Sequence, residues 1–391
     1  MNKFEHAESV VMNTYKRFPI IIAKGEGCYV YDDNGKKYLD FVAGIAVNTF
    51  GHGYPAVVDA IVKQAKEMLH VSNLYWTQSQ IDLADKLVKN SWFDKAFFCN
   101  SGAESIEAGL KLIRKYANKT HPERYEIITM KDSFHGRTFG AVTATGQEKY
   151  KQGLNPVLPG IKHVPFNDFE ALKEAVDEKT AGILLEPIQA EGGVIPGKKE
   201  YLQKVREFCT ENDIVLMYDE VQCGIGRTGR LFAHQYYDAP PDVMALAKGI
   251  AGGVPMGSLL ATDKVAIGFE PGDHASTFGG NPLAASVACV VLDELLEKGT
   301  MDNVKIQGEY LTKKLLKLKD KNSVITDVRG VGLLQGVQLS VDAGEIIVKC
   351  MEQGLLLVNA GSHVIRFVPA LNVKSEEIDK CIGILEKVLA S

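Results

Sequence analysis

Short apolar runs recur between about residues 55 and 265, and polar or helix-like segments separate them. Several runs are nearly continuous rather than alternating, which is typical of strands buried on both faces. Between them lie apolar residues at helical spacing, such as Ile106, Leu110 and Ile113. Strands that alternate with helices predict a mostly parallel, doubly wound sheet. We expect its strands at residues 96–99, 126–130, 182–185, 214–218, 243–247 and 257–261.

The two ends of the chain have different patterns. Residues 27–31 and 37–41 have the composition of strands, and the Asn-Gly pair between them predicts a hairpin. Residues 284–320 read as one long helical stretch, residues 333–339 and 355–358 as strands, and residues 375–390 as a final helix. We therefore expect an α/β protein with three parts. They are a large domain over residues 55–285, a smaller α+β domain over 286–391, and an N-terminal segment over 1–54 that joins the small domain.

The composition narrows the class of protein. The 391 residues are 46% apolar and 24% charged, and the net charge is −5, so no basic face for nucleic acid is expected. No apolar run approaches the roughly 18 residues that span a bilayer, and the mixed charges of the first residues do not resemble a signal peptide. The seven scattered cysteines include no Cys-x-x-Cys pair, which fits reduced thiols in the cytoplasm.

Two polar residues each follow an apolar run of the predicted sheet. Asp219 ends one run and Lys248 ends the next. Ligands of open α/β sheets bind beyond the carboxyl ends of the strands. There, a desolvated carboxylate could pair with a protonated ring nitrogen, and a desolvated lysine has a lowered pKa and can attack a carbonyl. Alone, Asp219 could equally cap a helix and Lys248 could be a surface residue, but together they predict a site.

A third strand leads into a candidate phosphate site. Ser101 and Glu104 form a capping-box pattern that starts a helix. Gly102 and Ala103 would then present free backbone N–H groups, as phosphate-binding helix termini do. A capped helix without a ligand is the alternative. The hydroxyls and small residues of 274–282 could donate to the same phosphate from a neighbouring loop.

Charged residues elsewhere suggest carboxylate recognition. Arg137 could bind a carboxylate through two hydrogen bonds, although a solvated loop arginine is the alternative. Arg366 lies among apolar residues, so we expect it to face an acid or an anionic ligand. Glu186 and Glu191 follow another predicted strand.

Other site types are disfavoured. Residues 224–229 match Gly-x-Gly-x-x-Gly, but five residues separate them from the strand and no convincing helix follows, so an active-site loop is favoured over a nicotinamide site. The histidines show no metal-binding spacing with a nearby acid, and we expect no metal. A Gly-x-Ser-x-Gly elbow is absent from the sequence.

Taken together, the residues resemble the class-III aminotransferases, which are pyridoxal-phosphate (PLP) enzymes of fold type I. Seven motifs occur in the family's order, so the resemblance covers nearly the whole chain. They are Phe50–Pro55, Asn100–Glu104, Phe134–Thr138, Glu186–Gln189, Asp219–Gly229, Leu246–Gly249 and Ser276–Pro282.

The resemblance implies a role for each candidate. Lys248 would hold PLP as a Schiff base and move a proton, and Asp219 would pair with the ring nitrogen. Ala103 replaces the family's usual threonine, but its backbone N–H remains. The cofactor-binding residues would be Gly102, Ala103, Phe134, Asp219, Glu220, Val221, Gln222, Lys248 and Thr277, the last reaching the site of the other subunit of a homodimer.

The resemblance also implies substrates. Residues 41–48 and 354–372 are most similar to members that use N2-acetyl-L-ornithine as amino donor and 2-oxoglutarate as acceptor. Ile45 stands where enzymes acting on free ornithine typically have a tyrosine. Glu191 would mask Arg366 in the first half-reaction and free it for 2-oxoglutarate in the second. The substrate-binding residues would be Arg137, Ser276, Glu191, Arg366, Tyr15 and Ile45.

Four alternatives stay open at this stage. The donor could be succinylornithine, ornithine, 4-aminobutyrate (GABA) or another ω-amine. The reaction could be an intramolecular amino transfer that needs no 2-oxoglutarate. The chain could be a binding protein that keeps the fold, or a nicotinamide dehydrogenase.

Overall fold

A seven-stranded sheet organises the larger part of the computed structural model, which describes residues 3–390. Its strand order is β4-β12-β11-β10-β7-β5-β6, and the strands are β4 (Lys95–Cys99), β5 (Glu126–Met130), β6 (Ile161–Val164), β7 (Thr180–Leu185), β10 (Val215–Asp219), β11 (Val243–Leu246) and β12 (Gly257–Ala261). Only β12 runs antiparallel to its neighbours. The predicted strands are all confirmed, whereas β6, an edge strand of four residues, was not predicted.

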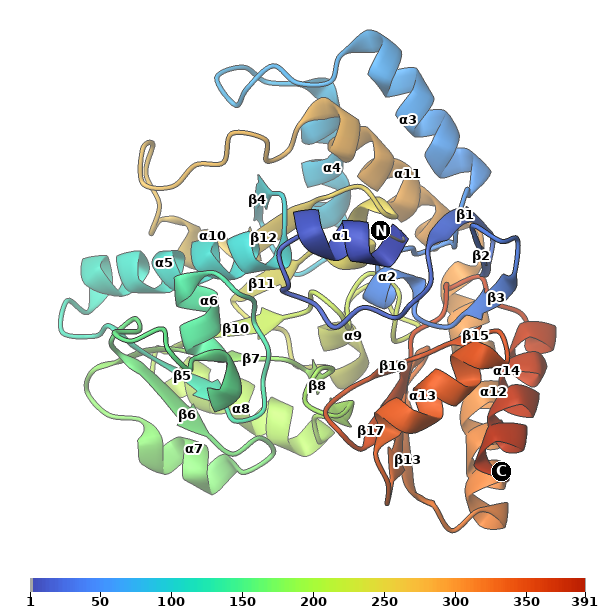
Figure 1. Ribbon diagram of the computed structural model, residues 1–391. Coiled ribbons are helices and arrows are strands. Elements are labelled where there is room, and N and C mark those ends of the chain that lie inside the picture. Colours follow the sequence, from blue (N-terminus) through green and yellow to red (C-terminus); the bar gives the residue numbers. More distant parts are fainter. Residues whose placement is uncertain (1–2, 391) are drawn as a thin grey trace.

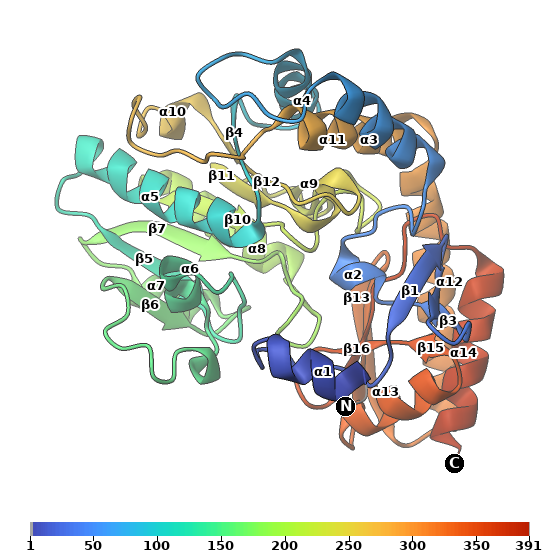
Figure 2. The same cartoon turned by 45° about the horizontal axis from the view of Figure 1, so that its top comes forward.

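Helices cover both faces of this sheet, as expected for a doubly wound fold (Figures 1 and 2). On one face α5 crosses β12 and β11 and buries Ile106, Leu110 and Ile113, which confirms the helical spacing in the sequence. The helices of this part are α3 (Pro55–Glu67), α4 (Gln78–Lys89), α5 (Gly102–Thr120), α6 (Phe139–Ala144), α7 (Phe169–Ala175), α8 (Lys199–Glu211), α9 (Ala233–Tyr237) and α10 (Asp263–Ala266). Short elements between them are η1 (Glu148–Tyr150), η2 (Lys248–Ala251), β8 (Ile188–Gln189) and β9 (Ile195–Pro196).

The predicted helical stretch at 284–320 is two helices, so this prediction was wrong in one respect. They are α11 (Pro282–Glu297) and α12 (Thr300–Lys321). Gly299 adopts φ 72° between them, a left-handed conformation that glycine tolerates and that ends a helix. The chain thereby turns from the large sheet into the C-terminal part (Figure 1).

Two smaller sheets lie beside the large one. The first, β1-β2-β3-β15, contains β1 (Ile22–Glu26), β2 (Tyr29–Asp32), β3 (Lys37–Asp40) and β15 (Leu355–Leu356). The second, β13-β14-β17-β16, contains β13 (Ile325–Val331), β14 (Leu334–Leu339), β16 (Val358–Asn359) and β17 (Val364–Phe367). The remaining helices are α1 (Lys3–Val10), α2 (Ala43–Ala46), α13 (Ala343–Glu352) and α14 (Ser375–Leu389).

The pairing of these sheets connects the two ends of the chain. β15 pairs with β3, while β16 joins the other sheet, so the single strand expected at 355–358 is split between two sheets. The hairpin of β2 and β3 and the final helix α14 are confirmed. The domain boundaries at 54 and 285 stay predictions, and residues 1, 2 and 391 lie outside the described part.

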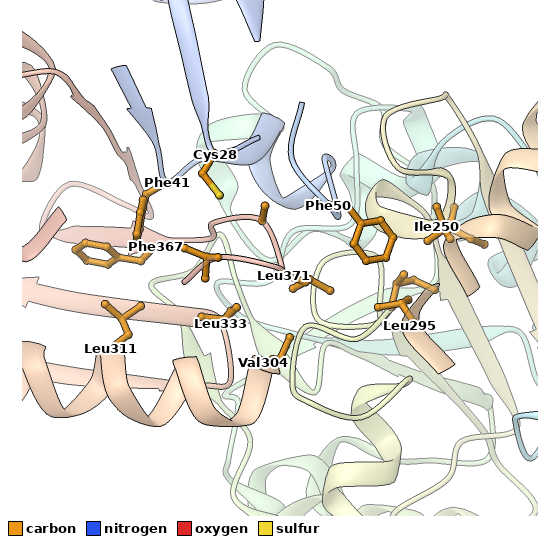
Figure 3. Packing of buried hydrophobic residues seen from close by; sticks show 14 of the residues in the cluster. Cys28, Phe41, Phe50, Ile250, Leu295, Val304, Leu311, Leu333, Phe367 and Leu371 are labelled. Carbon is orange, nitrogen blue, oxygen red and sulfur yellow. The ribbon is translucent and has the colours of Figure 1, made fainter. Parts of the chain in front are cut away.

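One apolar core spans the region where these parts meet. Figure 3 shows Phe41, Phe50, Leu295, Leu311 and Phe367 as parts of one continuous cluster, although they come from the N-terminal segment, α11, α12 and β17. All five side chains are almost completely buried. This core therefore joins the N-terminal segment and the C-terminal part of the chain to the part that contains the large sheet. Within residues 3–390, no helix combines the length and the apolar character needed to cross a membrane.

Candidate active site

A pocket of about 340 Å³ opens at the carboxyl ends of β4, β7 and β10, next to the residues that follow β11. Its size lies in the range of small-molecule sites. It is lined by Val47, Asn100, Ser101, Gly102, Ala103, Phe134, His135, Gly136, Glu186, Glu191, Asp219, Val221, Gln222, Ala247, Lys248 and Gly253–Met256. Seven of the predicted cofactor residues and one predicted substrate residue, Glu191, are therefore gathered in one cavity.

Lys248 occupies a strained position in this pocket. Its φ of 48° lies in the left-handed region, which is sparsely populated by residues other than glycine and is often found at functional sites. Burial lowers the pKa of its amine, the charge of Glu191 opposes this shift, and the charge of Arg366 adds to it. A buried amine with a lowered pKa is more often uncharged and can act as a nucleophile or a base.

Asp219 is held by groups that fix the direction of its carboxylate. Its Oδ2 lies 2.7 Å from Nδ1 of His135, and its Oδ1 accepts a hydrogen bond of 3.0 Å from the N–H of Val221. Because a carboxylate only accepts, His135 carries its hydrogen on Nδ1 and can accept from the hydroxyl of Thr129, 3.2 Å from its Nε2. The carboxylate is 5% exposed at most and would be costly there without a cationic partner.

The N-terminus of helix α5 lines another side of the pocket. Ser101 is its N-cap, and its hydroxyl accepts from the N–H of Glu104 at 3.2 Å, so the predicted cap is confirmed. The carboxylate of Glu104 accepts from the N–H of Asn100. Within residues 3–390, the N–H groups of Gly102 and Ala103 have no hydrogen-bond acceptor, as is usual for the first turn of a helix. A side chain at position 102 would approach Val221 to 2.8 Å, so glycine keeps this end of the pocket open.

An ion pair forms the wall on the side of the small sheets. Arg366 on β17 donates to Glu191 at 2.5 and 3.1 Å, and to the side-chain oxygen of Gln222 at 2.7 Å. Burial alone would raise the pKa of Glu191, but the charges of Arg366 and Lys248 more than offset it and lower the pKa to about 2. The Nε of Arg366 is buried without an acceptor in the described part of the chain.

Glu186 also faces the pocket, although no role was assigned to it from the sequence. Its oxygens accept from the N–H of Phe134 at 3.0 Å and of Ala190 at 3.3 Å. Burial raises the pKa of its carboxyl group well above the ordinary value, and the charge of Asp219 adds to this shift. We infer that Glu186 fixes the backbone that carries Phe134.

The structure does not bring Glu220 to the pocket, contrary to the sequence prediction. Successive side chains of an extended chain point to opposite sides, so Glu220 turns away where Asp219 turns in. Its carboxylate is completely buried and accepts from the N–H groups of Ala233 at 2.5 Å and His234 at 2.7 Å. Glu220 therefore anchors the start of α9.

Five further predicted residues are not in the wall of the pocket. Arg137 and Thr277 are exposed, and Tyr15 is 69% exposed. Ser276 accepts from the side chain of Asn100 at 3.1 Å. Ile45 is 38% exposed and has φ 63°, a strained value for a β-branched residue. The single subunit does not bring these five together in the cavity.

His135 and the loop 253–256 line the pocket, but the sequence assigned no role to them. His135 lies inside the quoted motif at 134–138, but only the contact with Asp219, 84 positions away, gives it a role. The glycine-rich stretch after Lys248 was noticed, and its left-handed Gly252 and Gly253 explain why the chain can fold back over the pocket.

The groups in this pocket fit PLP. Two free N–H groups at a helix N-terminus suit its phosphate, a desolvated carboxylate suits a protonated ring nitrogen, and a buried amine suits its carbonyl group. Residues 224–229 form a series of turns rather than a strand-to-helix connection, as a dinucleotide site would require. Within residues 3–390, no group of three or more His, Cys, Asp or Glu could hold a metal ion.

Comparisons with known proteins agree with this site. The family model of the class-III aminotransferases matches residues 10–389. The acetylornithine aminotransferase of Clostridium acetobutylicum is 51% identical over 383 residues, covering 97% of this chain and 99% of that protein. That of Methanocaldococcus jannaschii is 48% identical, covering 96% and 95%.

Solved structures show the same similarity. The ornithine aminotransferase of Toxoplasma gondii has a TM-score of 0.95 at 31% identity, covering 99% of this chain and 94% of that one. The N-acetylornithine aminotransferase of Stenotrophomonas maltophilia has a TM-score of 0.84 at 38% identity, covering 96% and 97%. The predicted family, fold class and cofactor are confirmed. The chain belongs to the class-III aminotransferases, which depend on pyridoxal phosphate.

Proposed function

We propose that the chain transfers the δ-amino group of N2-acetyl-L-ornithine to 2-oxoglutarate. The products are N-acetyl-L-glutamate 5-semialdehyde and L-glutamate, and the reaction is a step of arginine biosynthesis. The observation that carries the proposal is the similarity to acetylornithine aminotransferases of about 50% identity along nearly the whole chain. A location in the cytoplasm is part of the proposal, and the seven free cysteines support it.

We assign the cofactor to residues of the pocket. The N–H groups of Gly102 and Ala103 would bind its phosphate, Phe134 and Val221 would contact its ring, and Gln222 would contact its phenolic oxygen. When bound, PLP supplies a carbonyl group that condenses with amines and a ring that withdraws electrons from the neighbouring carbon–hydrogen bond. The carboxylate of Asp219 would keep the ring nitrogen protonated, and His135 holds that carboxylate in position.

Lys248 then has two tasks in this proposal. Its amine would hold the cofactor until the donor binds. The same amine, with its lowered pKa, would take the proton from the donor's δ-carbon and later return it.

We assign the two substrates to two arginines. Arg137 and Ser276 contact the carboxylate end of the amino donor while Glu191 masks Arg366. Glu191 then releases Arg366, which binds 2-oxoglutarate. The pairing of Arg366 with Glu191 supports this assignment, because the guanidinium already donates to both oxygens of a carboxylate there. Tyr15 and Ile45 complete the donor side.

Replacing Glu191 with alanine tests this switch. Arg366 would lose its masking partner and bind the carboxylate of an α-amino acid in the first half-reaction. We expect the ratio of kcat/KM for N2-acetyl-L-ornithine over L-glutamate to fall about tenfold or more. The interaction energy of a close charge pair is about 1.4 kcal/mol or more, which corresponds to this factor. Stopped-flow half-reactions measure both constants. Glu309→Ala, on the surface of α12, is the control, and an unchanged ratio would contradict the switch.

The donor is tested by a panel of amines with 2-oxoglutarate. We expect the highest kcat/KM for N2-acetyl-L-ornithine, compared with N2-succinyl-L-ornithine, L-ornithine and 4-aminobutyrate. In the variant Ile45→Tyr, the ratio for free ornithine over the acetylated donor should rise several-fold. A higher wild-type value for another donor would replace the proposed substrate. Turnover without 2-oxoglutarate would instead indicate an intramolecular amino transfer.

We also propose a homodimer in which Thr277 of each subunit completes the other subunit's phosphate site. Within one subunit Thr277 lies outside the cofactor pocket, along a groove that it shares with Leu74 and Trp76. Those two apolar side chains are 83% and 85% exposed. The loop that carries them is joined to the loop of Thr277, because Asn73 donates to the backbone of Ser276 and Gly279 at 3.0 and 2.9 Å. Exposed apolar surface of this kind is typical of an interface.

The variant Trp76→Asp tests the dimer. A charge at the centre of an apolar interface is expected to weaken association and, with it, cofactor retention and activity. Sedimentation velocity and activity at several protein concentrations measure both effects. Ile306→Asp, at an exposed position on α12, should leave both unchanged. A fully active monomeric variant would show that the site needs no second subunit.

A further inference from the structure

The guanidinium of Arg137 lies on an aromatic ring that the function proposed above does not use. Its central carbon is 3.9 Å from the centroid of the Tyr150 ring and 5.6 Å from that of Phe134. Within residues 3–390, the side chain of Arg137 has no acidic partner and no hydrogen-bond acceptor. The aromatic contacts are therefore what orders this exposed side chain.

The position of Tyr150 is fixed by the chain before it. The carbonyl oxygen of Gly146 accepts a hydrogen bond of 3.1 Å from the N–H of Asp132. Only glycine fits at position 146, because a Cβ there would come within 2.0 Å of the carbonyl oxygen of Met130. The amide of Gln147 donates to the backbone of Asp132 and Ser133. Residues 132–133 directly precede Phe134, so Tyr150 is anchored to the same backbone that carries the pocket wall.

The two aromatic rings contact one another. Tyr150 and Phe134 meet edge to face, with centroids 5.7 Å apart. Phe134 lines the cofactor pocket, and its N–H is held by Glu186. The ring of Tyr150 thus contacts both Phe134 of the pocket wall and the guanidinium of Arg137, and the amine of Lys149 lies 4.8 Å from its centroid. An ordered cation at this place can meet a substrate carboxylate at the pocket mouth.

We propose that Tyr150 is a positioning residue for the amino donor, whose ring holds the guanidinium of Arg137 in place before the donor's carboxylate arrives. An arginine side chain loses rotamer freedom when it binds, and a ring that already holds it reduces this loss. The inference rests on the proposed function, because it requires Arg137 to bind the donor's carboxylate. It adds the residue that gives Arg137 its direction.

The test compares two donors that differ only in the carboxylate. N-acetyl-1,4-diaminobutane is N2-acetyl-L-ornithine without that group. In the holoenzyme, Tyr150→Leu is expected to raise KM for N2-acetyl-L-ornithine about two- to fivefold, the usual range of a cation–π contact near the surface, and to leave kcat unchanged. The constants for N-acetyl-1,4-diaminobutane should not change. Tyr150→Phe keeps the ring and should behave as the wild type.

Further variants distinguish a failure of this inference from a failure of the proposed function on which it rests. Arg137→Gln should raise KM for the acetylated amino acid more strongly, and Tyr150→Leu should add little in the double variant, because both act through one guanidinium. Equal losses with both donors would overturn the inference and place the effect of Tyr150 on Phe134 and the cofactor. An effect of Arg137→Gln without one of Tyr150→Leu would overturn the inference alone. No effect of Arg137→Gln would overturn both the inference and the assigned role of Arg137.

Discussion

Replacing Lys248 with alanine is expected to lower kcat with N2-acetyl-L-ornithine by about 10⁴-fold or more. In the proposed assignment the variant would lose both the amine that holds the cofactor and the base that moves the proton, and proton transfer by a positioned group alone contributes about 10²–10⁴-fold. Neighbouring groups cannot substitute. The charge that acts most strongly on Lys248, Glu191, is paired with Arg366 and has a pKa of about 2, so it is a poor base.

Three measurements check this expectation. Steady-state kinetics give the loss of turnover, and the visible absorbance of the bound cofactor should change because its bond to the protein is absent. A small primary amine added to the variant should restore part of the rate, since it replaces the missing base. Lys317→Ala, on the surface of α12, is the control. A Lys248→Ala enzyme that keeps turnover and the wild-type absorbance would contradict the assignment.

The sequence predicted the large sheet well because its strands are buried on both faces. Runs such as residues 214–218 are almost entirely apolar, and only a strand in the middle of a sheet needs that pattern. The edge strand β6 has just one buried residue in four, so its pattern carried little signal. The break at Gly299 was missed for another reason. Helical spacing continues on both sides of it, and one glycine in a left-handed conformation turns the chain without disturbing that spacing.

In the site too, residues whose role follows from the adjacent sequence could be predicted, and residues whose role depends on contacts in the fold could not. Lys248 and Asp219 could be predicted because each follows an apolar run, and the strand ends of a doubly wound sheet meet at one edge. His135 and Tyr150 could not be given roles, since these depend on contacts between segments far apart in sequence or on the direction of a side chain. Glu220 shows the reverse error, because adjacency to Asp219 suggested a cofactor contact that strand geometry forbids.

Asp219→Asn is the second substitution with a large expected effect. Asparagine keeps the shape of the side chain and removes the negative charge that would keep the cofactor's ring nitrogen protonated. Without that proton the ring withdraws electrons less strongly, so the carbon–hydrogen bond breaks more slowly. We expect kcat to fall about 10²–10³-fold, as for the loss of one group that stabilises charge in the transition state. KM for the donor should change little, because the proposed assignment places Asp219 against the cofactor and not against the substrate.

The half-reaction with N2-acetyl-L-ornithine under single-turnover conditions isolates this step from product release. Cofactor retention after gel filtration shows whether the variant still binds PLP. His135→Gln is expected to give a smaller loss, about tenfold, because it leaves the charge and removes only the group that orients it. Asp59→Asn, on the exposed face of α3, should have no effect. If Asp219→Asn binds the cofactor and reacts at the wild-type rate, then the carboxylate does not control the ring nitrogen. If His135→Gln loses as much as Asp219→Asn, the two residues act as one charged unit rather than as an anion and its support.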